Sequence, residues 1–258
     1  MIALNHTKRK LLAGERAIGL GVSLLRGAAV PMIARTAGYD WLFIDREHGA
    51  LTEDDAAQIC LAALAHGITP VVRVCEGAID EATRALDAGA QGIVIPHVDT
   101  PEQARAMAAA LRFPPRGTRS WGGGTAVWGL RPPAMATAME QADAELLLAV
   151  MIETTEAVAN ADAIAAVPGI DALLVGSSDL SISMGIAGQF GQPRMREAYE
   201  RLATACTRHG KALGLGGIYD DTLARDYIRA GCRFIIAGHD QGLILNAATA
   251  RAALLRAT

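Results

Sequence analysis

The sequence predicts an α/β fold: a closed (β/α)8 barrel, a TIM barrel, in which eight parallel strands are each followed by a helix. Eight short apolar runs alternate with Ala-rich helical stretches. Strands that are continuously apolar are typical of parallel sheets buried on both faces. The length of 258 residues agrees with the roughly 250 residues of such barrels. An open doubly wound sheet is the alternative for the same alternation.

The expected elements follow this alternation along the whole chain. Pro101 suits the first turn of a helix, and Gly231 suits the position just after one. Strands are expected at Ile18–Ser23, Trp41–Asp45, Pro70–Val74, Gly92–His97, Leu146–Glu153, Ala172–Gly176, Lys211–Gly217 and Arg233–Gly238. Helices are expected at Asp54–His66, Ala78–Ala88, Pro101–Arg112, Thr155–Val167, Arg194–His209 and Asp221–Ala230.

Residues 113–144 interrupt the regular spacing. They contain two Pro-Pro pairs and the glycine run Gly122–Gly124. We expect a long excursion after the fourth strand, partly helical near its end, of the kind that forms a lid or contacts a partner. No linker-like stretch divides the chain, so residues 1–258 are expected to form a single domain.

The composition argues against a nucleic-acid-binding, membrane-spanning or secreted protein. The net charge is −3 without a basic cluster, which argues against nucleic acid or an anionic membrane as the main partner. No apolar stretch approaches the roughly 20 residues of a membrane span, and the N-terminus lacks a secretory signal. Cys60, Cys75, Cys206 and Cys232 show no CxxC spacing, so we expect reduced thiols in a cytoplasmic protein.

Two acidic residues stand at the ends of separate apolar runs. Glu153 follows the expected fifth strand and Asp179 follows the sixth. A carboxylate in that position is desolvated unless something positive meets it, and hard oxygen ligands favour an ion such as Mg²⁺ or Mn²⁺. The pattern predicts a shared metal site. The alternative is that each carboxylate caps the helix that follows its strand.

Other strands also end in groups that can carry chemistry. His48, three residues after Asp45, is a candidate proton carrier because imidazole titrates near neutrality. Asp45 could orient it, whereas Glu47 is expected to point elsewhere. Arg73 ends a buried strand and needs an anionic partner, either a substrate oxygen or, as the structural alternative, Glu47 or Asp87. From sequence alone, Asp87 is more simply a surface or return-loop residue.

Two further patterns bear on the reaction class. The glycines in Gly214-Leu-Gly216-Gly217 and in Ala237-Gly238 could hold a phosphate, as the loops after strands seven and eight do in many barrels. Ser177 and Ser178 do not stand in a G-x-S-x-G elbow, which disfavours hydrolase chemistry.

Together the motifs resemble the HpcH/HpaI family of metal-dependent 2-oxo acid aldolases, such as 4-hydroxy-2-oxoheptanedioate aldolase and 2-dehydro-3-deoxyglucarate aldolase. Each motif is weak, but the set covers most of the chain in the expected order. The matching segments are Gly38–Gly49, Pro70–Val74, Leu86–Pro96, Phe113–Gly117, Met151–Thr154 and Gly176–Ser181.

This resemblance implies a class II aldolase that reversibly cleaves a 4-hydroxy-2-oxo acid into pyruvate and an aldehyde, through a metal-stabilised enolate. It implies a divalent metal (Mg²⁺, Mn²⁺ or Co²⁺) on Glu153 and Asp179, His48 as acid/base and Arg73 at the developing oxyanion. It also implies that Asp87 raises the basicity of His48. Substrate contacts are expected at Arg73, Met151, Gly176, Ser177, Ser178 and Asp179; the family often has Gln where Met151 stands.

The resemblance further implies a hexamer built as a trimer of dimers, with the last helix, roughly Gln241–Arg256, exchanged between neighbours. Two other functions compete with the aldolase. One is a citrate-lyase-like acyl-CoA C–C lyase, for which a basic patch for CoA phosphates would be expected. The other is a non-catalytic barrel that binds a small oxo acid.

Overall fold

Eight parallel strands close into a barrel in the order β1 to β8, and β8 pairs with β1. The computed structural model describes residues 1–123 and 125–257; Gly124, which ends the glycine run, and Thr258 lie outside the described residues. The predicted (β/α)8 barrel is confirmed. Its strands are β1 (Ala17–Val22), β2 (Trp41–Asp45), β3 (Thr69–Arg73), β4 (Gly92–Ile95), β5 (Leu147–Ile152), β6 (Ala172–Gly176), β7 (Ala212–Gly216) and β8 (Cys232–His239).

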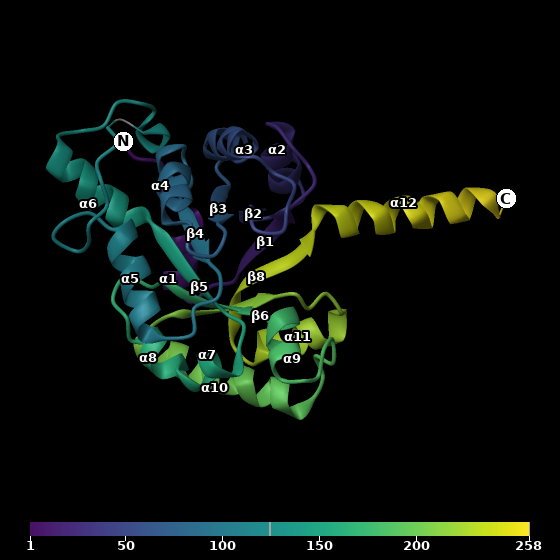
Figure 1. Cartoon of the computed structure of the whole chain (residues 1–258). Helices are drawn as coiled ribbons and strands as arrows, with labels where there is room; N and C mark the ends of the chain where they lie inside the picture. Colours follow the sequence, from purple (N-terminus) through teal and green to yellow (C-terminus); the bar gives the residue numbers. More distant parts are fainter. Residues whose placement is uncertain (124, 258) are drawn as a thin grey trace.

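Helices surround the barrel (Figure 1). Thr52 and Thr100 start α3 and α5 with capping boxes, and left-handed Gly67 and Gly210 end α3 and α10. The helices are α1 (His6–Leu12), α2 (Ala29–Thr36), α3 (Glu53–His66), α4 (Ile79–Asp87), α5 (Pro101–Leu111), α6 (Met135–Glu145), α7 (Thr155–Ala159), α8 (Ala161–Ala165), α9 (Ser177–Ser183), α10 (Pro193–His209), α11 (Asp221–Arg229) and α12 (Asp240–Arg256), with a 3-10 turn at Ala126–Trp128.

The helices differ from the expected set in two ways. The single helix expected at Thr155–Val167 is divided into α7 and α8 at Asn160, whose side-chain amide donates to the carbonyl of Asp99 at 2.8 Å. In addition, α1, α2 and α9 were not expected. In α1, Leu11 joins the apolar residues inside the barrel, so this helix covers the N-terminal end of the barrel.

Side chains of the strands alternate between the barrel interior and the surrounding helices, as strand geometry requires. Trp41, Phe43 and Phe234 lie in the interior cluster, and the rings of Trp41 and Phe234 stack with centroids 4.0 Å apart. Gly19 makes room for this pair, because a Cβ there would lie 2.2 Å from the Trp41 ring. The N-terminal end of the interior is therefore filled by aromatic side chains.

The same two-residue period places polar residues at the other end of the interior. Asp45 follows Trp41 and Phe43 in the inward set of β2, and Arg73 follows Val71 in β3. Glu153 follows Met151 at the end of β5, and β6 ends at Gly176. The inward positions thus change from apolar to ionisable at the C-terminal rim, where barrels of this class carry their sites.

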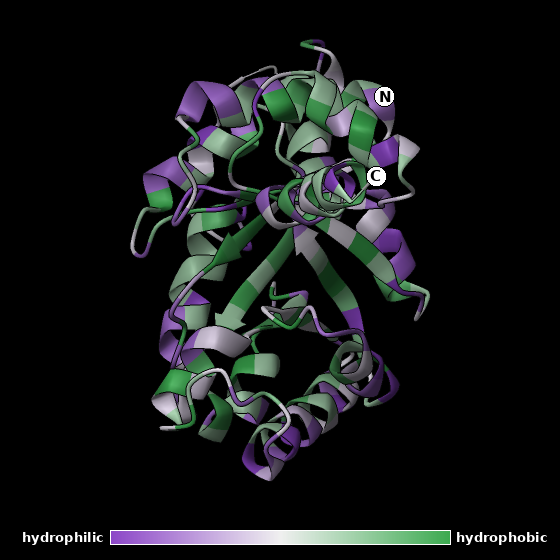
Figure 2. Cartoon of the chain, turned by 90° about the vertical axis from the view of Figure 1, so that its right-hand side faces the viewer, coloured by the Kyte–Doolittle hydropathy of each residue, from purple (hydrophilic) through white to green (hydrophobic). Residues whose placement is uncertain are grey.

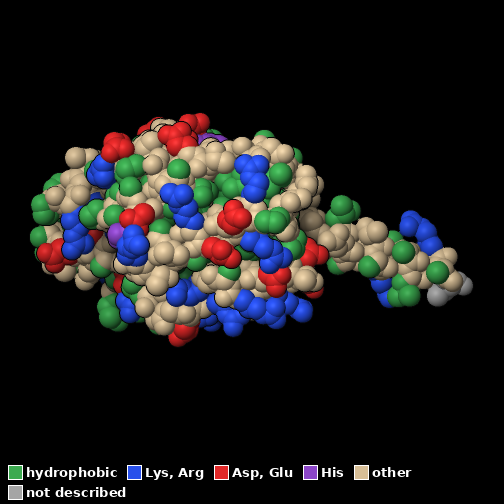
Figure 3. All heavy atoms as spheres, turned by 90° about the horizontal axis from the view of Figure 1, so that it is seen from below, with side chains coloured by type: hydrophobic (Ala, Val, Ile, Leu, Met, Phe, Trp, Pro, Cys, Tyr) green, Lys and Arg blue, Asp and Glu red, His purple; other side chains and the backbone are tan. Residues whose placement is uncertain are grey.

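The last helix leaves the barrel. Helix α12 extends away from β8 instead of packing over β8 and β1 (Figure 1). Figure 2, in which α12 points toward the viewer, shows mainly hydrophobic strands, and Figure 3 shows α12 as a projecting arm with hydrophobic side chains on its surface. These include Leu243, Ile244, Leu245, Leu254 and Leu255, which are 42–62% exposed.

The neighbouring surface of the barrel is also apolar. Ile18 of β1 and Met32 and Ile33 of α2 are 40–55% exposed, on the side where a helix after β8 would normally pack. No helix in residues 1–123 and 125–257 is both long and apolar enough to cross a membrane.

Candidate active site

A pocket of about 160 Å³ opens at the C-terminal ends of the strands. We call it the rim pocket. It brings together most of the residues that the sequence predicted for the site, and Asp45 lies directly behind it through its contact with Arg73. The lining residues are Phe43, His48, Arg73, Met151, Glu153, Gly176, Ser177, Ser178, Asp179, Gly216, Gly217, Tyr219, Ile236 and His239.

Arg73 is fixed by two carboxylates. Its Nε and Nη2 donate to the two oxygens of Asp45 at 2.9 and 2.6 Å, and its Nη1 lies 2.9 Å from Oε2 of Glu47. The guanidinium also lies over the Phe43 ring, 5.1 Å from its centroid. The sequence-based alternative of an ion pair with Glu47 is confirmed. Arg73 nevertheless lines the pocket, so a fixed guanidinium faces any ligand there.

Arg73 also lowers the pKa of the Asp45 carboxyl. Burial raises the pKa of the Asp45 carboxyl, but the hydrogen bonds and charge of Arg73, with the backbone N–H groups of His48 and Glu47, outweigh that effect. The net pKa lies below the ordinary value. Asp45 is therefore a carboxylate that holds Arg73, and its oxygens are already taken.

Glu153 is the most enclosed acid of the pocket, with 2% of its side chain exposed. Burial raises its pKa above the ordinary value; the backbone N–H and charge of His97 oppose this, and the charges of Asp179 and Glu47 add to it. Gly176 allows the carboxylate its place, because a Cβ there would lie 2.6 Å from Oε1 of Glu153. Burial therefore outweighs the contact with His97, and a cation beside the carboxylate would lower this pKa.

The charges of the pocket fit a divalent cation. The carboxylates of Glu153 and Asp179 line the pocket with the guanidinium of Arg73, and Asp45 and Glu47 contact that guanidinium from behind. Among the described residues, no group of three or more His, Cys, Asp or Glu side chains is arranged to hold a metal. Two carboxylates with further positions left to water and substrate are the donor set that Mg²⁺-type ions use. Glu153 and Asp179 fit such an ion.

The imidazole of His48 does not have the partner that the sequence suggested. Asp45 accepts hydrogen bonds from the backbone N–H groups of Glu47 and His48, both at 3.1 Å, and no contact joins it to the ring. Glu47, expected to point elsewhere, is nearer, with Oε2 3.9 Å from Nε2 of His48. The His48 side chain is 66% exposed. The expectation that Asp45 orients the imidazole is wrong, because Arg73 occupies that carboxylate.

The segment after β6 supplies backbone groups rather than a free hydroxyl at Ser177. Its Oγ donates to the carbonyl of Gly216 at 2.6 Å and shares a hydrogen bond with Tyr199 at 2.8 Å. Ser178 and Asp179 stand in the first turn of α9, where backbone N–H groups have no partner within the helix. Met151, near the end of β5, lines the same pocket, and its Sδ lies 3.8 Å from Nη1 of Arg73.

Asp87 is not in the rim pocket. It ends α4, before β4 begins, and so lies at the N-terminal end of the barrel, whereas His48 follows the C-terminal end of β2. At about 3.3 Å per residue, strands of this length separate the two ends by on the order of 15 Å. Within one chain, the structure does not bring Asp87 to His48.

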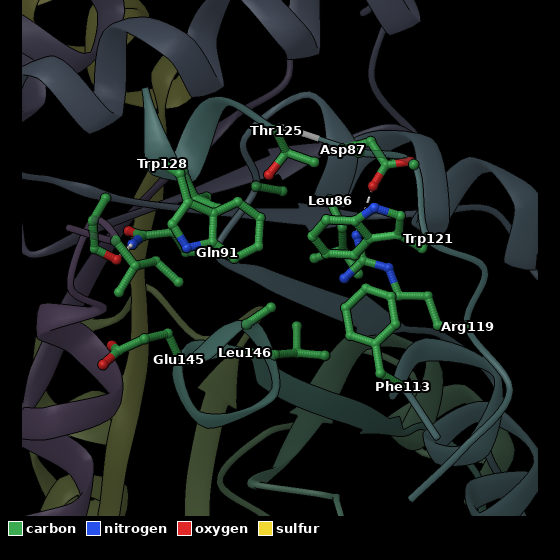
Figure 4. Close-up of a pocket in the computed structure, with 17 residues that line it drawn as sticks. Leu86, Asp87, Gln91, Phe113, Arg119, Trp121, Thr125, Trp128, Glu145 and Leu146 are labelled. Carbon is green, nitrogen blue, oxygen red and sulfur yellow. Dashed lines mark hydrogen bonds and ion pairs between the residues drawn. The ribbon is translucent and has the colours of Figure 1, made fainter. Parts of the chain in front are cut away.

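Asp87 instead contributes to a second pocket, here called the Asp87 pocket (Figure 4). Nη2 of the buried Arg119 lies 2.7 Å from Oδ1 of Asp87, and the guanidinium lies over the Phe113 ring at 4.8 Å. Trp121 and Trp128 complete an aromatic wall, with centroids 6.0 Å apart. The cavity is small, about 30 Å³, enough for one or two water molecules.

Several residues in the pocket or in contact with its acids received no role from the sequence. Tyr219 and His239 line the pocket with ring centroids 6.1 Å apart, and burial lowers the pKa of His239. His97 contacts both Glu47 and Glu153. Phe43 and His97 could have been found from the strand pattern, since each lies at or near a strand end. Tyr219 follows β7 in a loop, where no periodicity indicates direction.

Comparison with known proteins places the chain. Residues 24–247 match the family described as HpcH/HpaI aldolase/citrate lyase. The chain is 42% identical to a 4-hydroxy-4-methyl-2-oxoglutarate aldolase of Hapsidospora irregularis, over 93% of this chain and 90% of that protein. It is 38% identical to a hydroxypyruvate/pyruvate aldolase of Delftia acidovorans, over 98% and 93% of the two chains.

A solved structure agrees with these sequence relatives. The crystal structure of an HpcH/HpaI aldolase from Desulfitobacterium hafniense superposes with a TM-score of 0.91 and 28% identity, covering 96% of each chain. The resemblance inferred from the motifs is confirmed: the chain belongs to the HpcH/HpaI aldolase/citrate lyase family.

Proposed function

We propose that the protein is a metal-dependent class II aldolase that reversibly cleaves a 4-hydroxy-2-oxo acid into pyruvate and an aldehyde. The observation that carries the proposal is the rim pocket, which is lined by the carboxylates of Glu153 and Asp179 and by the guanidinium of Arg73, itself fixed by Asp45 and Glu47. The relatives described above are named as aldolases of 2-oxo acids. Their names favour this reaction over an acyl-CoA lyase or a non-catalytic barrel.

Glu153 and Asp179 would hold a divalent cation, Mg²⁺, Mn²⁺ or Co²⁺. When bound, the cation supplies a Lewis acid that polarises the keto group of the substrate. With two carboxylate ligands from the protein, further coordination positions would be left for a chelating 2-oxo acid. Burial is the first cause of the raised pKa of Glu153, and a cation beside this carboxylate would lower that pKa.

The chain's own groups would then bind and orient the substrate. The N–H groups of Ser178 and Asp179 can donate to the substrate carboxylate, because the first turn of α9 leaves them unpaired. Gly176 and Gly217 line the pocket next to these N–H groups, and their lack of a side chain leaves space there for a ligand. Arg73, held by Asp45 and Glu47, stands in one orientation and would donate to the oxygen on which negative charge develops. Met151, next to Arg73, would contact the same ligand.

His48 would carry the proton of the aldehyde-derived hydroxyl. Its side chain is accessible at the mouth of the pocket, so it can exchange protons with solvent or through a water molecule. If Asp87 assists His48, it has to come from a second copy, because the two residues lie at opposite ends of the barrel within one chain. Asp87 keeps 35% of its side chain exposed although Arg119 is buried, so a neighbouring copy could reach it.

We propose a homo-oligomer in which α12 packs on another copy, as in a hexamer made of three dimers. The exposed Leu and Ile residues of α12 and the exposed Ile18, Met32 and Ile33 of the barrel are complementary apolar surfaces. A helix of 17 residues that exposes apolar side chains in water is stabilised when a partner covers it. Exchange between two copies would cover both surfaces at once.

A cytoplasmic location is part of the proposal. All four cysteines belong to the described residues and are free thiols, the usual state in a reducing compartment. Burial raises the pKa of Cys60 and of Cys206 to about 12, which makes these thiols unreactive.

The decisive experiment removes the carboxylates one at a time. Glu153→Gln and Asp179→Asn should each lower kcat for pyruvate release from a 4-hydroxy-2-oxo acid by about 1,000-fold or more, with unchanged circular dichroism. Chelation of the wild-type protein should have the same effect, and Mg²⁺ or Mn²⁺ should reverse it. Asp162→Asn, at an exposed carboxylate paired with Arg208, is the matched control and should keep full activity.

A second measurement tests the half-reaction without choosing an aldehyde. Pyruvate in D₂O should exchange its methyl protons only with enzyme and metal present. For the first experiment, near-normal turnover of Glu153→Gln or Asp179→Asn in the presence of chelator would refute the proposal. For the exchange experiment, the absence of exchange with every metal would favour the non-catalytic barrel.

A further inference from the structure

His97 has a backbone conformation that L-residues rarely adopt. It follows β4 and Pro96 with φ of +53°, in the left-handed region. Among the described residues, the only other non-glycine residue with positive φ is Leu130, at φ +63°. Such strain in a non-glycine residue is commonly retained where the side chain has a task.

The left-handed turn directs two groups of His97 to one oxygen. The backbone N–H donates to Oε2 of Glu153 at 2.8 Å, and Nδ1 of the ring lies 3.3 Å from the same atom. The other oxygen, Oε1, faces Gly176, where only the absence of a Cβ leaves room for it. Oε2 is therefore engaged with His97, and Oε1 is the oxygen left for a ligand.

The far side of the ring meets a second acid. Nε2 of His97 lies 3.4 Å from Oε1 of Glu47, whose other oxygen contacts Arg73 at 2.9 Å. His97 thus stands between the carboxylate assigned to the cation and the carboxylate that holds the guanidinium. Leu130 has the same backbone strain but is 71% exposed and lines neither pocket.

We propose that His97 is a positioning residue that fixes the orientation of Glu153 and so presents Oε1 to the cation. The inference rests on the proposed function, because it concerns the same metal carboxylate. Hydrogen-bond partners behind a metal ligand hold its orientation and typically change metal affinity by about 10- to 100-fold when removed. The contact between His97 and Glu47 would also fix the position of Glu153 relative to Arg73.

The test measures Mn²⁺ binding to the full-length protein without substrate, from the electron paramagnetic resonance signal of free Mn²⁺. His97→Gly keeps the backbone N–H and relieves the left-handed strain, but it removes the ring; the Kd for Mn²⁺ should rise about 10-fold. His97→Asn tolerates positive φ, and its side-chain N–H₂ replaces Nδ1; the Kd should stay within about threefold of wild type.

Leu130→Gly is the matched control, because it relieves the same backbone strain outside the pocket. Both glycine variants should keep or raise the urea midpoint, but Leu130→Gly should leave the Kd for Mn²⁺ unchanged. Should His97→Gly fail to fold, His97→Leu takes its place, since Leu130 itself adopts this conformation. His97→Leu should also raise the Kd about 10-fold.

The outcomes separate this inference from the proposed function. A wild-type protein that binds Mn²⁺ and releases pyruvate, with a His97→Gly Kd within twofold of wild type, overturns the role of His97 and leaves the aldolase intact. Equal weakening by His97→Asn and His97→Gly also overturns it, because the asparagine would still hold Oε2. A wild-type protein that binds no Mn²⁺ overturns both.

Discussion

The barrel contains two arginine–aspartate pairs that are built alike and lie at opposite ends. Arg73 pairs with Asp45 in the rim pocket and lies over Phe43; Arg119 pairs with Asp87 in the Asp87 pocket and lies over Phe113. In the first pair both side chains are buried and joined by two hydrogen bonds. In the second a single hydrogen bond joins a buried arginine to an aspartate that is 35% exposed.

The difference concerns which partner is left free to act. In the rim pocket both oxygens of Asp45 accept hydrogen bonds from Arg73. The guanidinium, which also contacts Glu47, lines the space for a ligand. In the Asp87 pocket the guanidinium is enclosed and the carboxylate is the accessible partner. The same pair of residue types thus presents a cation at one end of the barrel and an anion at the other. Four predictions test this contrast.

The largest effect is expected at Arg73. Lysine keeps the charge but cannot donate twice to Asp45 and also reach Glu47, so Arg73→Lys should lower kcat/KM for the 4-hydroxy-2-oxo acid about 100-fold or more. Arg119→Lys can keep its single hydrogen bond to Asp87 and should lose less than about 10-fold. Steady-state kinetics of the two variants at equal metal saturation make the comparison. Equal losses would contradict the different roles assigned to the two arginines.

Asp87 should matter only through a neighbour. Asp87→Asn and His48→Ala should each lower kcat about 100-fold or more. When the two inactive variants are denatured together and reassembled, random pairing would unite an intact His48 with an intact Asp87 in up to about a quarter of the sites. Activity should therefore recover on mixing. Mixed oligomers that form, as shown by mass spectrometry, but stay as inactive as the separate variants would rule out a shared site.

Each pocket also has a glycine that touches its acid. A Cβ at Gly176 would lie 2.6 Å from Oε1 of Glu153, and one at Gly122 would lie 2.7 Å from Oδ2 of Asp87. Glu153 is enclosed and cannot move away, so Gly176→Ala should weaken Mn²⁺ binding about 10-fold. Asp87 is partly exposed and can turn aside, so Gly122→Ala should leave Mn²⁺ binding unchanged. Titration calorimetry with Mn²⁺ checks both, and a Gly176→Ala protein with normal affinity would remove Gly176 from the site.

The smallest effect is the acid dependence of stability at Asp45. Its pKa is lower in the folded protein than in the unfolded chain, so the stabilisation is present above the unfolded value of about 3.9 and is lost as the pH falls through the folded value. The free energy of unfolding of wild type should therefore exceed that of Asp45→Asn by more at about pH 6 than at a pH well below the unfolded pKa. Urea titrations across this range measure it; a constant difference would contradict the pairing.

Many of the residues at the C-terminal rim could be predicted from the sequence, because the two-residue period of a strand fixes which side chains point into the barrel. In Trp41-Leu-Phe-Ile-Asp45 the two-residue period that buries Trp41 and Phe43 also turns Asp45 inward. The same rule places Glu153 behind Met151. The barrel follows from the alternation of apolar runs and helices, and its closure is confirmed.

The positions of loop residues and the break between α7 and α8 could not be predicted, because they depend on individual contacts and not on a repeating pattern. The loop after β2 is shaped by the hydrogen bonds of Asp45 to two backbone N–H groups, and these turn Glu47 toward Arg73 while leaving His48 exposed. The division between α7 and α8 depends on Asn160 reaching Asp99, 61 residues away in sequence. The place of Asp87 was available in principle, since a residue that ends a helix before a strand lies at the N-terminal end of the barrel.

The departure of α12 from its own barrel carries a consequence for mixtures of chains. The helix spans roughly 25 Å at 1.5 Å per residue, so in the proposed oligomer damage near its tip would lie far from the pocket of the same molecule and against the surface of another copy. Co-expression of an intact chain with one carrying charged residues at Leu254 and Leu255 should then depress the activity of the intact copies. Because the proposed shared site needs the assembly, dilution that separates the copies should also lower the activity of the intact enzyme.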